Sequence, residues 1–124
     1  MKIISFAWTV EPLVRGQKTC TRRNWLDDYA RRFKSNEYVQ AFDREPRQGG
    51  QCVATIQLTC DPYKEFLMDM TDEEEKAEGG VWGSAKAFIE AYCRGADAIF
   101  DYELWVIRFK LVKIEAAGMK YLEG

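Results

Sequence analysis

The chain has 124 residues and a formal net charge of −2, with 47% apolar and 14% aromatic residues. This length and composition suffice to bury one hydrophobic core and exclude a disordered chain, so we expect a single domain over residues 1–124. The sequence contains no histidine, which excludes a histidine-containing catalytic triad and removes the commonest general base. Its four cysteines form no Cys-x-x-Cys pair, so we expect neither a metal site nor a cofactor.

The two halves of the chain differ in charge. Residues 1–50 hold ten Lys and Arg against six Asp and Glu, whereas residues 51–124 hold eight against fourteen. An anionic partner is therefore expected to bind the first half, although composition alone favours a soluble surface of mixed charge. Glu11 and Arg15 interrupt the apolar N-terminus, and no segment is long and apolar enough to span a membrane. We expect a cytoplasmic protein with reduced thiols and no membrane partner.

The first 23 residues predict a strand, a short helix and an extended segment. A buried strand over residues 2–8 is indicated by the apolar side chains Ile3, Ile4, Phe6 and Trp8. Thr9 is a suitable N-cap and Gly16 a suitable left-handed C-cap for a helix over residues 10–15. The β-branched residues between positions 19 and 23 favour extended chain.

Residues 24–50 predict a helix, a strand and a loop. Asn24 can cap a helix with one apolar face, formed by Trp25, Leu26, Tyr29, Ala30 and Phe33. Residues 37–43 predict a strand, and Pro46 with the pair Gly49-Gly50 predicts a loop over residues 44–50.

The second half predicts two strands and two capped helices. Residues 52–60 alternate as a half-buried strand, with Cys52 and Cys60 as small core residues. Thr71 with Glu74 forms a capping box, and Ser84 caps a second helix that we expect to end at Gly95. The last strand is the strongest, with an inner face of Trp105, Ile107, Phe109 and Leu111. Because strands and helices do not alternate strictly, we expect an α+β fold with a small, mixed, mostly antiparallel curved sheet or β-barrel and peripheral helices.

The octapeptide Gly16-Gln17-Lys18-Thr19-Cys20-Thr21-Arg22-Arg23 concentrates the reactive groups of the chain. Its cations and hydroxyls suit a phosphate or a polar nucleobase, and Lys18 lies close enough in sequence to act as a base for Thr21. A solvated basic edge, with Thr21 only a strand-former, is the alternative explanation. Cys20 is either a thiol activated by these cations or a small buried strand residue.

The octapeptide resembles the signature of the ASCH domain, a small β-barrel of the PUA-like superfamily. Thr21 and Arg23 follow Gly16-Gln17-Lys18-Thr19 at the spacing of that family, an acidic segment ends at Glu78-Gly79, and a long apolar strand closes the domain. The resemblance covers nearly the whole chain. It implies one ASCH/PUA-like domain that binds a nucleotide, a modified nucleoside or RNA.

One branch of this family is an amidohydrolase that removes the acetyl group from the exocyclic amine of acetylated cytidine. The resemblance implies that its lysine, threonine and glutamate correspond to Lys18, Thr21 and Glu78, and that substrate binding involves Gly16, Thr19, Arg22 and Arg23. A partly desolvated lysine beside two arginines has a lowered pKa and can take a proton from Thr21 or from a water. Glu78 can then protonate the leaving amine, unless it belongs to a solvated acidic face.

Residues 25–50 form an insertion relative to the small amidohydrolases, and this insertion supports a second interpretation. It carries Arg31, Arg32 and Arg47 close to Trp25, Tyr29, Tyr38 and Phe42, which together predict a basic surface with stacking rings for single-stranded RNA. ASCH and PUA-like domains are associated with RNA binding, and some are similar to ribonucleases. A non-catalytic RNA-binding module and a metal-independent ribonuclease therefore stay open, although the pI near 5.3 speaks against strong non-specific RNA affinity.

Overall fold

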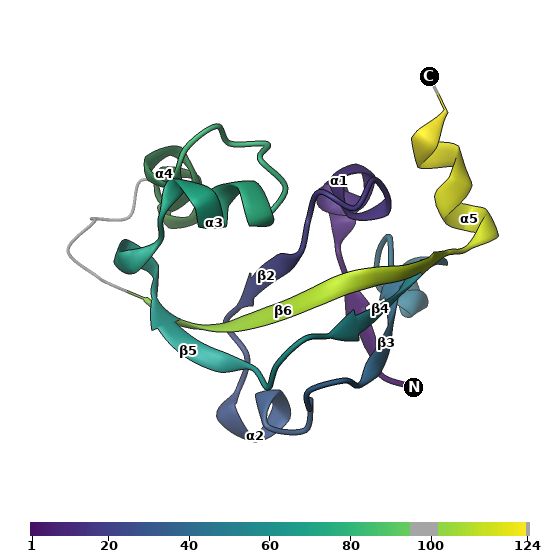
Figure 1. Cartoon of the computed structure of the whole chain (residues 1–124), viewed down its shortest axis with the longest axis horizontal. Coiled ribbons are helices and arrows are strands. Elements are labelled where there is room, and N and C mark those ends of the chain that lie inside the picture. The colour runs from purple at the N-terminus through teal and green to yellow at the C-terminus, as the bar shows by residue number, and fades with distance from the viewer. Residues whose placement is uncertain (95–101, 124) are drawn as a thin grey trace.

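The computed structural model describes residues 1–94 and 102–123. It is an α+β fold in which helices surround one curled sheet (Figure 1). The strands are β1 (Ile3–Ser5), β2 (Cys20–Arg23), β3 (Tyr38–Phe42), β4 (Cys52–Leu58), β5 (Tyr63–Phe66) and β6 (Glu103–Ile114). The α-helices are α1 (Val10–Val14), α2 (Asp27–Ala30), α3 (Asp72–Ala77), α4 (Ala85–Cys93) and α5 (Ala116–Met119).

The sheet has the strand order β1-β3-β4-β6-β2, and β5 also pairs with β6. The pair β1–β3 is parallel and the other pairs are antiparallel. The long strand β6 joins the two parts of the sheet, because its first half pairs with β2 and β5 and its second half with β4. The prediction of a mixed, mostly antiparallel curved sheet is confirmed.

The sheet is an open half-barrel, so the predicted β-barrel is present only in part. Its two end strands, β1 and β2, are not paired with each other in the described part of the chain. The physical reason is the length of β1, which stops at Ser5 because Ala7 takes a left-handed φ of +48° and turns the chain away. We call the gap between these strands the seam; it is bordered by Ser5, Phe6, Thr21 and Arg23.

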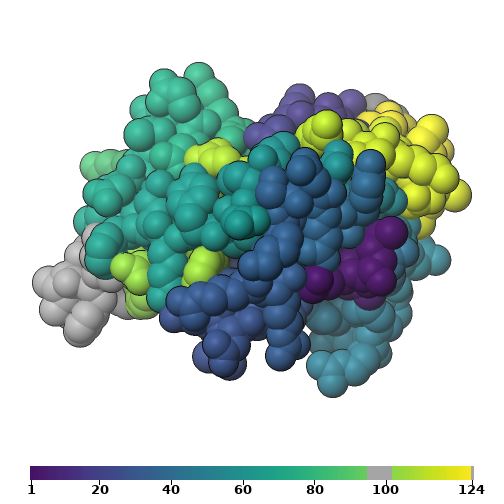
Figure 2. Space-filling model, turned by 60° about the horizontal axis from the view of Figure 1, so that its bottom comes forward, coloured from purple at the N-terminus to yellow at the C-terminus, as the bar shows by residue number. Residues whose placement is uncertain are grey.

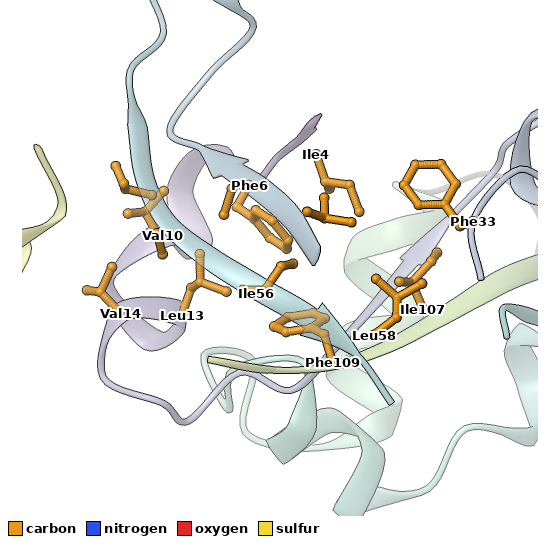
Figure 3. Packing of buried hydrophobic residues seen from close by; sticks show 14 of the residues in the cluster. Ile4, Phe6, Val10, Leu13, Val14, Phe33, Ile56, Leu58, Ile107 and Phe109 are labelled. Carbon is orange, nitrogen blue, oxygen red and sulfur yellow. The ribbon is translucent and has the colours of Figure 1, made fainter. Parts of the chain in front are cut away.

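The main hydrophobic core lies inside the curl of the sheet. Ten of its members are labelled in Figure 3: Ile4, Phe6, Val10, Leu13, Val14, Phe33, Ile56, Leu58, Ile107 and Phe109. The rings of Phe6 and Phe109 meet edge to face with centroids 5.6 Å apart. A second, smaller cluster holds α4 against the start of β6 and consists of Leu67, Met70, Ala85, Phe88 and Leu104. Helix α3 packs against α4 and also contacts β2.

Most predicted elements are confirmed, and so are the caps at Gly16, Thr71 and Ser84. The other N-caps are not, because the Thr9 hydroxyl donates to the Phe6 carbonyl and Leu26, not Asn24, precedes α2. Helix α1 and strands β2, β3, β4 and β6 lie where the sequence placed them. The Thr71 hydroxyl accepts a hydrogen bond from the Glu74 amide, and the Ser84 hydroxyl accepts one from the Ala87 amide. Gly16 has the left-handed φ of +75° that a C-cap needs. The expected helix end at Gly95 lies outside the described residues.

Several local expectations are wrong. Helix α2 begins at Asp27 and has only four residues, and Leu26 is 82% exposed because it lies before the helix as its N-cap. Trp8 is 67% exposed because β1 ends before it. Cys52 and Cys60 are half-buried and not part of the core. Strand β5 and helix α5 have no counterpart in the sequence-based prediction.

Among the described residues, no helix is long and apolar enough to cross a membrane.

Candidate functional site

A cavity of about 490 Å³ lies at the seam. Its floor comes from the end of β1, the octapeptide and the end of α3, and its wall comes from the residues after Gly80 and from α4. The lining residues are Ser5, Phe6, Ala7, Trp8, Thr9, Lys18, Thr21, Arg22, Arg23, Glu78, Trp82, Phe88, Ala91, Tyr92 and Arg94. Volumes of this size are typical of small-molecule sites. The open half-barrel thus leaves a concave site at the place where its end strands fail to pair.

Lys18 points into this floor because of the turn after α1. The amides of Gln17 and Lys18 both donate to the carbonyl of Pro12, at 2.9 and 3.0 Å, and the left-handed Gly16 permits the bend. The Lys18 side chain is only 3% exposed, and its Nζ donates to the Glu78 carbonyl oxygen at 2.8 Å. Burial lowers the pKa of Lys18 from its ordinary value of 10.5, Arg23 lowers it further, and the Glu78 carboxylate opposes both. The lowered pKa that the sequence predicted is confirmed in direction, and burial is its main cause.

Glu78 is the last residue before a glycine turn and is buried. Its Oε1 accepts a hydrogen bond from the Arg22 amide at 3.0 Å, and its Oε2 lies 3.5 Å from Lys18 Nζ. Gly79 has a φ of +128°, and a Cβ there would lie 3.1 Å from Cγ of Pro12, so the turn favours glycine. With 2% of its surface exposed, Glu78 does not belong to a solvated acidic face.

Thr21 and Arg23 point to the same face of β2, since they are two residues apart. Arg23 Nε donates to the Thr21 hydroxyl at 3.0 Å, and Arg23 Nη2 donates across the seam to the Ser5 carbonyl at 2.6 Å. Burial lowers the pKa of Arg23, whose guanidinium also lies 5.3 Å from the centre of the Phe6 ring. Among the described residues, Arg23 has no carboxylate in ion-pair contact, and the buried Ser5 hydroxyl has no hydrogen-bond partner. Within the described residues, the site therefore combines a half-buried cation that has no ion-pair partner with an unsatisfied hydroxyl.

Arg22 points away from that face. Its guanidinium is 1% exposed and forms ion pairs with Glu65, at 2.8 Å, and with Glu74. Arg22 borders the cavity, but these two carboxylates hold its charged end.

The remaining predicted residues lie outside the cavity. Gly16 and Thr19 are exposed; Gly16 serves the turn, and the Thr19 amide donates to the Ala77 carbonyl at 2.7 Å. The RNA-binding candidates Arg31, Arg32 and Arg47 are also exposed.

The RNA-binding candidates belong to two places on the surface. Arg31 and Arg32 follow α2, and the Arg31 guanidinium lies 5.9 Å from the centre of the Trp105 ring. Arg47 borders a separate, shallow hollow of about 430 Å³ beside the first residues of the chain. Figure 2 shows the N-terminus (purple) next to the blue-green loop that carries Arg47.

The aromatic wall of the cavity was not predicted as a unit. Trp82 lines the cavity together with Trp8, Phe88 and Tyr92. Tyr63 lies outside this wall, on β5, where its hydroxyl accepts a hydrogen bond from Arg108 at 2.8 Å. The three glycines around Trp82 were the available signal, because such a loop can bring a ring close to a neighbouring element.

Cys20 is a buried strand residue and not an activated thiol. It is 0% exposed, and burial raises its pKa to about 12. We therefore expect iodoacetamide at pH 8 to label the partly exposed Cys52, Cys60 and Cys93 in the native protein, and Cys20 only after unfolding in guanidinium. Peptide mass spectrometry would measure this, and labelling of native Cys20 as fast as Cys52 would contradict the buried assignment.

Comparisons with known proteins give the fold alone. No protein-family description matches the sequence, and no curated protein matches it. The crystal structure of protein EF3133 from Enterococcus faecalis V583, described there as family-model DUF984, is similar to this chain with a TM-score of 0.60 and 18% sequence identity. The similarity covers 89% of this chain and 73% of that chain.

Proposed function

We propose that the seam cavity binds an acylated cytosine-type nucleoside or nucleotide and hydrolyses the amide on its exocyclic amine. The observation that carries this proposal is the convergence of Lys18, Thr21 and Glu78 in one cavity, where Lys18 Nζ lies 2.8 Å from the Glu78 carbonyl and 3.5 Å from its carboxylate. The same three positions follow from the resemblance to the ASCH amidohydrolases. We accordingly propose that the curled sheet is an ASCH-type, PUA-like domain whose barrel stays open at the substrate site.

Lys18 is the base in this proposal. Burial favours its neutral amine, which can take the proton from the Thr21 hydroxyl or from a water held by that hydroxyl. The resulting oxygen nucleophile attacks the acyl carbon. A lysine is a reasonable base in this chain because the sequence offers no histidine.

Glu78 and Arg23 complete the reaction. The Lys18 ammonium passes the proton that it took across 3.5 Å to the Glu78 carboxylate, and Glu78 gives this proton to the leaving amine as the C–N bond breaks. Where Thr21 itself attacks, a water deprotonated by Lys18 then hydrolyses the acyl-threonine ester, and Lys18 returns that proton to the Thr21 oxygen. Arg23 is hydrogen-bonded to Thr21 at 3.0 Å and has no ion-pair partner among the described residues, so its charge is available to the oxyanion that forms beside Thr21.

A panel of cytidines carrying acyl groups on the exocyclic amine tests this function. We expect turnover that persists in a chelator and that Thr21→Val lowers by about 100-fold or more, because it removes the hydroxyl that attacks or positions the water. Thr55→Val is the matched control, since the Thr55 hydroxyl lies on β4 and bonds Glu115 at 3.2 Å, outside the cavity. Absence of turnover across the panel with folded protein would refute the hydrolase.

RNA binding by the insertion is the weaker candidate. The ring of Phe33 is fully buried, and Trp25 stacks on it at 4.8 Å, so neither is presented as a platform. Arg31, Arg32 and Arg47 lie outside the cavity. The ribonuclease alternative would require the same cavity to cleave a phosphodiester, and unmodified single-stranded RNA in the substrate panel distinguishes it.

A further inference from the structure

Trp8 is an unusual residue for the rim of a cavity because most of its ring faces solvent. It is 67% exposed, although an indole ring ordinarily buries most of its surface. The preceding residue, Ala7, has a φ of +48°, a conformation that costs energy for a residue with a Cβ. Both residues line the cavity. The backbone is thus strained at the point that holds a large apolar ring out of the core and over the site.

The ring beneath Trp8 is firmly held. Trp82 meets Phe88 with centroids 4.4 Å apart, and Trp8 leans on Trp82 edge to face at 5.0 Å. The Trp82 amide donates to the carboxylate of Glu75 at 3.2 Å, and Glu75 is 2% exposed. One side of Trp8 is therefore supported by a fixed ring, while the rest of its surface stays free.

The loop that carries Trp82 has a backbone conformation that favours glycine. Gly79, Gly80 and Gly83 have φ values of +128°, +71° and +92°, which side-chain-bearing residues rarely adopt. The Gly80 amide also donates to the Glu75 carbonyl at 3.0 Å. Two separate segments, one after β1 and one after α3, thus use left-handed backbone to bring Trp8 and Trp82 together.

We propose that Trp8 is the stacking platform for the planar base of the ligand and the specificity-determining residue of the site. This inference rests on the proposed function, because it places the base of the acylated nucleoside against Trp8 and its amide over Lys18, Thr21 and Glu78. Each nucleobase has a π-face that stacks on an indole, whereas an aliphatic amide has none. In this arrangement the polar residues of the floor act on the amide bond, and stacking on Trp8 favours ligands that carry a planar ring.

Trp8→Ala and Trp8→Phe test this inference. Stacking contributes roughly tenfold or more to affinity per base, so Trp8→Ala should raise the KM for acetylated cytidine and the Kd for cytidine by about tenfold or more while kcat changes little. Trp8→Phe keeps a ring and should stay within about threefold of the wild type. Calorimetry measures the Kd of cytidine without turnover. Phe66→Ala is the matched control, because Phe66 is 45% exposed on β5 and does not line the cavity.

The outcomes separate this inference from the hydrolase proposal. Turnover by the wild type with an unchanged KM and Kd in Trp8→Ala would overturn the platform and leave the hydrolase standing. Binding of cytidine that depends on Trp8, without turnover of any acylated cytidine, would support the platform and refute the hydrolase. Absence of both cytidine binding and turnover would overturn both.

Discussion

Replacing Lys18 by methionine is expected to lower kcat/KM for an acylated cytidine by about 1,000-fold, the middle of the range that a general base contributes. Methionine keeps the length and apolar stem of the side chain but cannot accept a proton. Lys76→Met is the control, because Lys76 is an exposed lysine on α3, two residues from Glu78. Steady-state kinetics measures the effect, and far- and near-ultraviolet circular dichroism checks that the variant is folded. Activity within tenfold of the wild type would remove Lys18 from the role of base.

The burial of Lys18 also predicts how the activity and the stability of the protein depend on pH. The neutral amine is the reactive form, so kcat/KM should rise with pH through the lowered pKa of Lys18 and level off below 10.5. Lys18 should make the free energy of unfolding rise with pH as well. Between the lowered pKa and 10.5 the unfolded state binds more protons, so the free energy of unfolding rises with pH in that window, and Lys18→Met should abolish this rise.

Replacing Arg22 by methionine is expected to cost about 3–5 kcal/mol of unfolding free energy, the usual effect of removing one partner of a buried ion pair. The loss leaves the partly buried carboxylates of Glu65 and Glu74 without their main cation; the side chain of Arg22 itself is 1% exposed. Guanidinium denaturation at pH 7 measures the change as a shift of the midpoint at constant slope.

Arg108→Met is the matched control for Arg22. Arg108 also contacts Glu74, at 3.5 Å, but its side chain is 32% exposed. An exposed pair contributes at most about 1 kcal/mol, so this variant should be close to the wild type in stability. Equal effects of the two substitutions would show that the depth of burial does not decide the strength of this network.

Local signals explain which parts of the fold could be predicted. The caps at Thr71 and Ser84 and the turn at Gly16 depend on neighbouring residues only, and all three are present. The position of Trp8 depends on where β1 stops, and the apolar pattern continues past that point. Helix α2 covers only Asp27–Ala30, although the rings of Trp25, Tyr29 and Phe33 pack on one another at the spacing that predicted a longer helix. The opening of the barrel likewise depends on contacts between distant strands.

In the candidate site, too, neighbouring residues could be predicted to act together, whereas contacts between distant residues could not. Lys18, Thr21 and Arg23 are near neighbours in sequence, so the octapeptide itself indicated a reactive cluster. Glu78 came only from the resemblance, since its 60-residue separation from Lys18 hides their contact from any local pattern. The aromatic wall requires α4 to pack beside the seam, which no spacing in the sequence predicts.

The pairing of β2 has a consequence for the order of folding. Within the described residues, β6 is the only strand that pairs with β2, with Cys20 opposite Arg108 and Arg23 opposite Trp105. During synthesis the octapeptide therefore emerges long before its partner strand. It cannot form this strand pairing until residues 103–114 are available. Contacts between such distant segments form late and slow the folding of a domain. The floor of the cavity is thus expected to be among the last parts of the molecule to assemble.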